Sequence, residues 1–292
     1  MTAKKAKVDS PAGHRVALCL NSSFLGYFAH AGFLRALLGL SVRPVAVSGA
    51  SAGALVAGLF AAGIPPEEML QLFVSPELRK VFREPGAPLR GLGTILNLPG
   101  HTGALHGKRA AALLREKLGT RRIEECQSPR LALSVTNLSE GRSEAVTSGP
   151  LAELILASGA FPGVFATRAV EGHWFWDGGV ANHLPFDHWI DDPEIDTILV
   201  HIVANPEELA VRKGGRPHRM SHAVNLSHQI ICDELFRLKS ELARRAGKNL
   251  VVLRTISPRP RLWNPASVGA GCVEVGAATV EHNRAVLSEL AS

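Results

Sequence analysis

Short apolar runs and longer amphipathic runs follow one another along the chain. Residues 14–20, 44–48, 197–203 and 250–253 are short and apolar, which predicts buried strands. Residues 27–40, 54–60 and 267–290 have the composition and spacing of helices. This alternation predicts an α/β fold in which a layered sheet is covered by helices on both faces.

Two further segments leave alternatives open. Residues 221–245 form a long amphipathic pattern, whose apolar stripe we interpret as core, with membrane or partner docking as the alternative. Residues 65–107 are less regular and mix apolar with basic side chains. They are either a mobile lid or flap or an insertion packed on the core.

Length and composition favour one domain. The chain has 292 residues, of which 46 % are hydrophobic and 20 % are charged, and we expect a basic tail over residues 1–14 followed by a single domain over 15–292. The four cysteines are widely spaced, so we expect buried thiols rather than a zinc site or disulfides.

Charge and hydropathy bear on location and partners. The basic N-terminus runs into Asp9 and Pro11 instead of a long apolar segment, and no apolar stretch reaches the roughly 18 residues of a membrane span, so we expect a cytoplasmic protein. The net charge of +6 is dispersed, which disfavours nucleic acid as a partner and allows peripheral contact with an anionic membrane surface. The sequence does not indicate an oligomeric state.

The most informative motif surrounds Ser51. Gly49 and Gly53 flank it between a predicted strand and a predicted helix, which is the setting of a nucleophile elbow. Small flanking residues let the chain bend so that the hydroxyl points away from the sheet. The alternative is a chance match in a chain that contains 28 glycines.

A second turn follows the first predicted strand. The backbone N–H groups of Ser22, Ser23 and Phe24 precede a helix, where such groups can hold an oxyanion. An ordinary helix cap by Ser22 or Ser23 explains the same residues equally well.

The third element is an acid that ends an aromatic strand. Asp177 precedes Gly178 and Gly179, and a partly desolvated carboxylate with a raised pKa can accept a proton from a serine. An Asp-Gly pair alone is more often an ordinary turn.

Taken together, these motifs resemble the patatin-like phospholipases, serine lipid acyl hydrolases that use a Ser-Asp dyad. The ordered parts of the resemblance cover about residues 15–203 and are His30-Ala31-Gly32, the elbow over 49–53, Ala157-Ser158-Gly159 with Phe161-Pro162-Gly163, and Asp177-Gly178-Gly179 with Asn182 and Pro185. The resemblance implies a three-layer α/β/α fold with a mostly parallel central sheet.

The resemblance also implies roles for single residues. Ser51 is expected to form an acyl-enzyme with a phospholipid or lysophospholipid substrate, and Asp177 to act as its base, without a metal or an organic cofactor. His30 and His183 are then expected to be structural. Where the family commonly has a glycine-rich loop with a basic residue, this chain has residues 21–26 with Leu25 at the basic position. A non-hydrolytic lipid-binding or scaffold protein, and an acyltransferase that uses the same dyad, therefore remain alternatives.

Overall fold

The structure is a computed structural model that describes residues 14–206, 220–258, 260–261 and 267–291. The predicted basic tail lies outside the described residues, apart from its last residue. Five parallel strands form the centre of the sheet, in the order β10-β9-β1-β2-β4. These are β1 (Val16–Leu20), β2 (Ala46–Ala50), β4 (Arg130–Asn137), β9 (Thr197–Ala204) and β10 (Asn249–Ile256).

Antiparallel strands extend the sheet beyond β4. β8 (His173–Asp177) and β5 (Arg142–Val146) both pair with β4, and β7 (Arg168–Val170) pairs with β8. A separate parallel pair joins β3 (Gly103–Leu105) to β6 (Gly163–Phe165).

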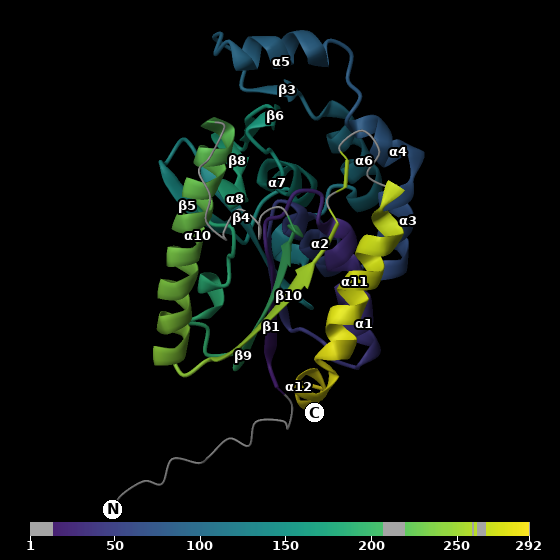
Figure 1. Cartoon of the computed structure of the whole chain (residues 1–292), viewed down its shortest axis with the longest axis vertical. Coiled ribbons are helices and arrows are strands. Elements are labelled where there is room, and N and C mark those ends of the chain that lie inside the picture. Colours follow the sequence, from purple (N-terminus) through teal and green to yellow (C-terminus); the bar gives the residue numbers. More distant parts are fainter. Residues whose placement is uncertain (1–13, 207–219, 259, 262–266, 292) are drawn as a thin grey trace, which may run out of the picture.

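Helices cover both faces of the main sheet (Figure 1). One face carries α1 (Tyr27–Gly39), α2 (Ala52–Ala61), α3 (Pro66–Val74), α4 (Pro76–Val81), α6 (Lys108–Leu118), α7 (Leu151–Ser158) and α11 (Gly269–His282). The other carries α10 (Met220–Arg245) and the short helix η2 (Asp187–Trp189). Short elements elsewhere are α5 (Ala87–Ile95), η1 (Ile123–Glu125), α8 (Gly178–Ala181) and α12 (Arg284–Glu289). The predicted three-layer fold with a mostly parallel sheet is confirmed.

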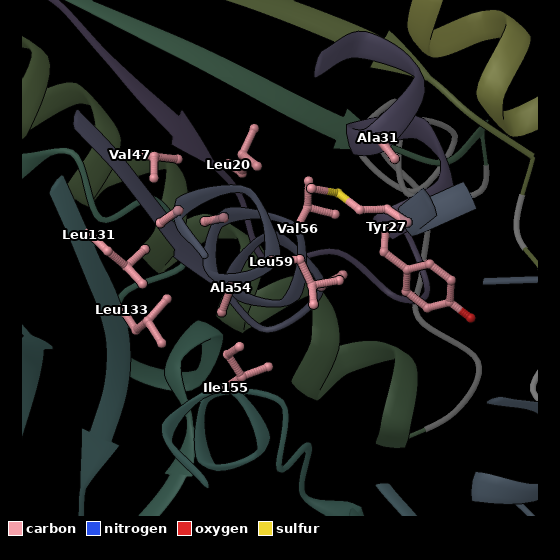
Figure 2. Close-up of a cluster of buried hydrophobic side chains, with 14 of the residues drawn as sticks. Leu20, Tyr27, Ala31, Val47, Ala54, Val56, Leu59, Leu131, Leu133 and Ile155 are labelled. Carbon is pink, nitrogen blue, oxygen red and sulfur yellow. The ribbon is translucent and has the colours of Figure 1, made fainter. Parts of the chain in front are cut away.

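The period of two along β1 divides the core between the layers. Leu18 and Leu20 belong to the larger cluster under α1 and α2, whereas Ala17 and Cys19 belong to the smaller cluster under η2 and α10. Figure 2 shows part of the larger cluster, into which Val47, Leu133 and Ile155 also point. A strand buried on both faces reads as a continuous apolar run, which is why residues 14–20 were recognisable in the sequence.

The region over residues 65–107 is more regular than predicted. It forms α3, α4, α5 and β3, and each of these three helices has a proline in its first turn. A proline in the first turn of a helix lacks only an N–H that has no intrahelical partner there. Pro66, Pro76 and Pro88 therefore each lie in the first turn of a helix, in a stretch whose sequence pattern is less regular than elsewhere.

Two predictions about the C-terminal helices are wrong. The predicted helix over 267–290 is two helices, α11 and α12, separated at Asn283. The apolar stripe of α10 is not core, because most of its members are exposed while the side with Ser240 and Ala243 is buried. The exposed members are Val224, Ile230, Ile231, Leu235, Leu238 and Leu242. Among the helices of the described part, none combines the length and hydropathy needed to cross a membrane.

Candidate active site

Ser51 stands at a strained bend between β2 and α2. Its backbone has φ 54° and ψ −116°, a region that residues with a Cβ seldom adopt. Such strain is expected where a nucleophile is held at the apex of a strand-to-helix turn. The structure therefore places the predicted elbow residue in the geometry that the sequence context suggested.

The flanking glycines are required by close approach of the backbone. A Cβ on Gly49 would lie 2.4 Å from the carbonyl of Gly53, and a Cβ on Gly53 would lie 2.3 Å from the carbonyl oxygen of Leu20. Both distances are far below contact, and both neighbours are main chain that cannot rotate away. The bend and the end of β1 can therefore meet only through glycine.

Ser158 is a residue of the site that we did not single out from the sequence. Its hydroxyl accepts a hydrogen bond of 3.0 Å from the N–H of Ser51 and donates one of 2.6 Å to the carbonyl of Ser134 in β4. It is fully buried, so it fixes the strained elbow to the sheet. The available signal was its place at the centre of the Ala-Ser-Gly motif that contributed to the family resemblance.

Strand register brings Asp177 to the same place. β4 lies between β2 and β8, and Ser134 pairs with Ala50 while the next residue, Val135, pairs with Asp177. Ser51 follows Ala50 directly, so the serine and the aspartate come about two strand spacings apart, roughly 10 Å between main chains. Side chains reaching toward each other can span that gap.

Burial controls the ionisation of Asp177. The carboxyl group is fully buried, which raises its pKa from 3.8 to about 7, while the Ser51 side chain and the N–H of Gly179 lower it as hydrogen-bonding neighbours. The Gly179 N–H donates to Oδ1 at 2.7 Å. Among the described residues, Oδ2 of Asp177 has no hydrogen-bond partner of ordinary geometry. The Ser51 hydroxyl is therefore close enough to lower the pKa of the carboxyl group, but it lies farther away or at a poorer angle than in an ordinary hydrogen bond.

The two glycines after Asp177 also lie close to other parts of the chain, Gly178 to backbone and Gly179 to a side chain. A Cβ on Gly178 would lie 2.0 Å from the carbonyl oxygen of Ser134, and one on Gly179 would lie 2.1 Å from the Ser22 hydroxyl. Asp177 therefore sits tightly between β4 and the loop over residues 21–26.

That loop differs in part from the expectation. The N–H of Ser22 donates to the carbonyl of His183 at 2.9 Å, so it is already used and is not available as an oxyanion donor. Ser23 and Phe24 line the cavity that Ser51 also lines. Leu25, at the position where the family commonly has a basic residue, has a positive φ of 52°.

Asn21 anchors this loop to β9. Its buried amide donates to the carbonyls of Ser22 at 2.7 Å and Val203 at 3.2 Å, and its Oδ1 accepts from the N–H of Val203 at 2.7 Å. No local sequence pattern indicates this role, because the partner residue lies 182 positions further along the chain.

His30 and His201 form a buried pair behind the loop. Their Nδ1 atoms are 2.9 Å apart, and Nε2 of His30 lies 3.1 Å from the carbonyl oxygen of Asn21. Burial lowers the pKa of His30 to about 3 and that of His201 well below its ordinary value. Both imidazoles are therefore neutral at physiological pH, and neither lines the cavity.

A cavity of about 1030 Å³ connects these parts. Ser51 and Asp177 both line it. One wall is apolar and comes from α2, α4, α6 and α7, with Leu55, Leu78, Val81, Leu113, Leu114, Ile155 and Leu156. The other wall comes from α10 and includes His228, Gln229 and Cys232. Cys232 is only half-buried there, whereas the other three cysteines are buried as predicted. The apolar wall can surround a hydrocarbon chain that begins at Ser51.

Residues 18–190 of the chain match the patatin-like phospholipase family, which is more than half of the 292 residues. The chain belongs to this family. The part of the patatin-like chain that matches contains the elbow, the loop over 21–26 and Asp177, whereas α10, β10 and α11 lie beyond it.

Individual relatives agree with this assignment. Uncharacterized NTE family protein Rv1063c of Mycobacterium tuberculosis and uncharacterized NTE family protein Mb1092c of Mycobacterium bovis are each 32 % identical over 181 residues, which is 61 % of this chain and 46 % of theirs. The match thus spans about half the length of these relatives. The crystal structure of VipD from Legionella pneumophila shares the fold, with a TM-score of 0.51 and 16 % identity over 94 % of this chain and 67 % of VipD.

Proposed function

We propose that the patatin-like chain hydrolyses carboxylic esters of lipids, with phospholipids or lysophospholipids as the substrate class. The observation that carries the proposal is the meeting of a strained serine and a buried carboxylate at one cavity with an apolar wall. Family membership supports lipid ester hydrolysis in general, and the geometry supports the assignment of roles to Ser51 and Asp177.

In the proposed reaction Asp177 acts as the base. The ionised carboxylate takes the proton of the Ser51 hydroxyl as Oγ attacks the ester carbonyl, and the same proton then goes to the departing alcohol. Water attacks the acyl-enzyme in the second half, giving its proton to Asp177, and the fatty acid leaves as Ser51 is restored. A pKa of about 7 suits a group that must both accept and donate a proton near neutrality.

The proposed oxyanion donors are the N–H groups of Ser23 and Phe24. Both residues line the cavity with Ser51, and the anchoring of Asn21 on β9 holds the loop in one position. The N–H of Ala52, at the start of α2 and also in the cavity lining, is a further candidate, because the first N–H groups of a helix have no intrahelical acceptor.

Replacement of two residues tests the proposal. Ser51→Ala is expected to abolish hydrolysis of a nitrophenyl ester and labelling by a fluorophosphonate, whereas Ser288→Ala, at an exposed serine, is expected to preserve both. Asp177→Asn is expected to slow turnover by about 10²- to 10⁴-fold. In the wild type kcat/KM is expected to rise as the pH passes about 7, because the base is the ionised form. Labelling of the Ser51→Ala protein at the wild-type rate would refute the assignment.

The loop supports a second candidate, a lipid-binding protein without hydrolytic activity. Leu25 replaces the basic residue and the Ser22 N–H is occupied, so fewer donors remain for the tetrahedral intermediate than the family pattern supplies. Fluorophosphonate labelling without ester turnover would favour this candidate. An acyltransferase would use the same dyad and would appear as transfer to an added alcohol.

A further inference from the structure

One part of the molecule presents apolar side chains to solvent in an unusually dense group. We call residues 87–105, which comprise α5 and β3, the α5 arm. Leu89 is 75 % exposed, Ile95 82 % and Leu92 53 %, and Leu96 and Leu98 follow with about half of their surface exposed. Figure 1 shows α5 and β3 at the top of the molecule, set apart from the three layers. Such groups of exposed apolar side chains commonly mark a surface that meets a partner or a membrane.

The α5 arm is nevertheless firmly built at its base. Arg90 donates from Nε to the carbonyl of Ala104 at 2.9 Å and contacts Glu84 at 3.3 Å. The nearly buried Glu84 also accepts from the N–H groups of His106 at 2.7 Å and Lys108 at 3.1 Å. These bonds tie both ends of the arm together, so its apolar face is presented by a folded element.

The α5 arm is attached to the edge of the cavity. Its strand β3 pairs with β6, from which Val164 and Phe165 line the cavity. Phe161, just before β6, lines the cavity and is half-exposed, so it lies where the cavity opens to solvent. A surface that covered the arm would therefore lie beside the cavity mouth.

Charge favours an anionic lipid surface as the occupant. Residues 76–109, the α5 arm with its flanks, contain six basic residues and two acidic ones. The basic residues are Arg79, Lys80, Arg83, Arg90, Lys108 and Arg109. Four of these, Lys80, Arg83, Lys108 and Arg109, are exposed, and basic groups close to an apolar tip add electrostatic attraction to anionic headgroups. The exposed stripe of α10 differs, because Arg237 beside it is paired with Glu234 and Arg244 is paired with Glu241, so these basic groups already have acidic partners.

We propose that the α5 arm inserts its apolar face into an anionic lipid surface and so holds the cavity mouth against that surface. The lipid nature of the substrate rests on the proposed function, but the docking itself requires no chemistry at Ser51. A substrate acyl chain could then move from the lipid layer past Phe161 to the apolar wall without crossing water.

The test measures binding and hydrolysis separately. In the Ser51→Ala background, flotation with vesicles of phosphatidylcholine, with or without phosphatidylglycerol, is compared for three proteins. These are the unaltered arm, the arm variant Leu89→Ser/Leu92→Ser/Ile95→Ser, and the matched α10 variant Ile231→Ser/Leu238→Ser/Leu242→Ser. The arm variant is expected to bind mixed vesicles at least about tenfold more weakly, and the α10 variant is expected to bind as the parent does. Binding is expected to weaken at high salt.

Several outcomes would overturn the proposal. These are no vesicle binding by the parent, equal binding by the arm variant, or loss of binding in the α10 variant alone. A parent that is dimeric by size-exclusion chromatography and becomes monomeric in the arm variant would assign the arm to a second copy of the chain. With Ser51 restored, the arm variant is expected to keep hydrolysis of a soluble short-chain ester and to lose it on vesicles. Absence of hydrolysis with both substrates in the wild type would refute the proposed function without affecting the binding result.

Discussion

On one side of the cavity, α2 approaches β1 and α8 approaches β4 through backbone atoms, whereas on the other side α10 meets the body through long side chains. Gly53 lies against the carbonyl of Leu20 and Gly178 against that of Ser134, so neither contact can be adjusted. α10 is held by Lys239, which reaches Asp187, and by Phe236 against Phe186. The side that carries Ser51 and Asp177 is therefore fixed by main-chain geometry, and the side that completes the cavity depends on side-chain contacts that can loosen.

The largest effect is expected where the backbone contact is closest. Gly53→Val would place a branched side chain against the carbonyl of Leu20 at the elbow, and we expect a loss of roughly 3 kcal/mol or more in the free energy of unfolding. Urea denaturation measures this loss in the free energy of unfolding. The control is Gly271→Ala in α11, where an added Cβ would meet no atom of the described residues within 4 Å and the helix should be unchanged or more stable. Equal stability of both variants would show that the elbow side is adjustable.

The next largest effect on stability is expected from the buried carboxylate of Asp177, on the same side of the cavity. In the folded protein the pKa of Asp177 is raised from 3.8 to about 7, so ionisation opposes folding. The penalty is absent below about pH 4, where the group is protonated in both states, and it grows until the pH passes about 7. Asp177→Asn removes the charge and retains an oxygen acceptor for Gly179, so it is expected to stabilise the protein near pH 8 by on the order of 2 to 4 kcal/mol at most.

Unfolding of the wild type and of Asp177→Asn at pH 5 and pH 8 separates this effect from a general change in packing. The gain should be clearly larger at pH 8. A gain of the same size at both pH values would mean that ionisation of Asp177 does not burden the fold. Because the same substitution is expected to slow turnover, the result would also show that stability is given up for function on this side.

The elbow side was largely predictable from the sequence, because backbone geometry demands particular residues locally. Gly49, Ser51 and Gly53 could be recognised without knowing what surrounds them, and Asp177 could be recognised with its two glycines. The occupied N–H of Ser22 and the anchoring by Asn21 could not, because their partners, His183 and Val203, lie more than 150 residues away in sequence. No local pattern encodes such pairings.

The α10 side was predicted in outline only. Periodicity correctly indicated a long helix, but it records how apolar residues are distributed around the axis and not what covers them. The inward side of α10 carries Lys239, Ser240 and Ala243, while the apolar stripe faces outward. Which face is buried depends on the sheet that the helix meets.

Lys239 anchors α10, and its replacement is expected to have a moderate effect on stability. Nζ of Lys239 contacts Asp187 Oδ1 at 2.6 Å and the carbonyl oxygen of Leu184 at 3.2 Å, with only 14 % of its side chain exposed. Lys239→Met is expected to cost about 1 to 3 kcal/mol and to speed amide hydrogen exchange in α10 more than in α2. The guanidinium of Arg237 is exposed and pairs with Glu234 on its own helix, so Arg237→Met is expected to cost less than about 0.5 kcal/mol. If Lys239→Met sped amide hydrogen exchange equally in α10 and α2, Lys239 would not be a specific anchor of α10.

The smallest effect is expected on the outward face of α10. Leu238 and Leu242 are more than half exposed, so replacing both by glutamine removes little buried apolar surface, and the change should stay within about 0.5 kcal/mol per site. Ala243, fully buried on the opposite face, is the matched contrast, since Ala243→Gln would force a polar side chain between α10 and the sheet and should cost more than both outer substitutions together. Urea denaturation at several protein concentrations measures both. A large, concentration-dependent loss from the outer pair would mean that another copy of the chain covers this stripe in solution, and α10 would then be fixed from outside.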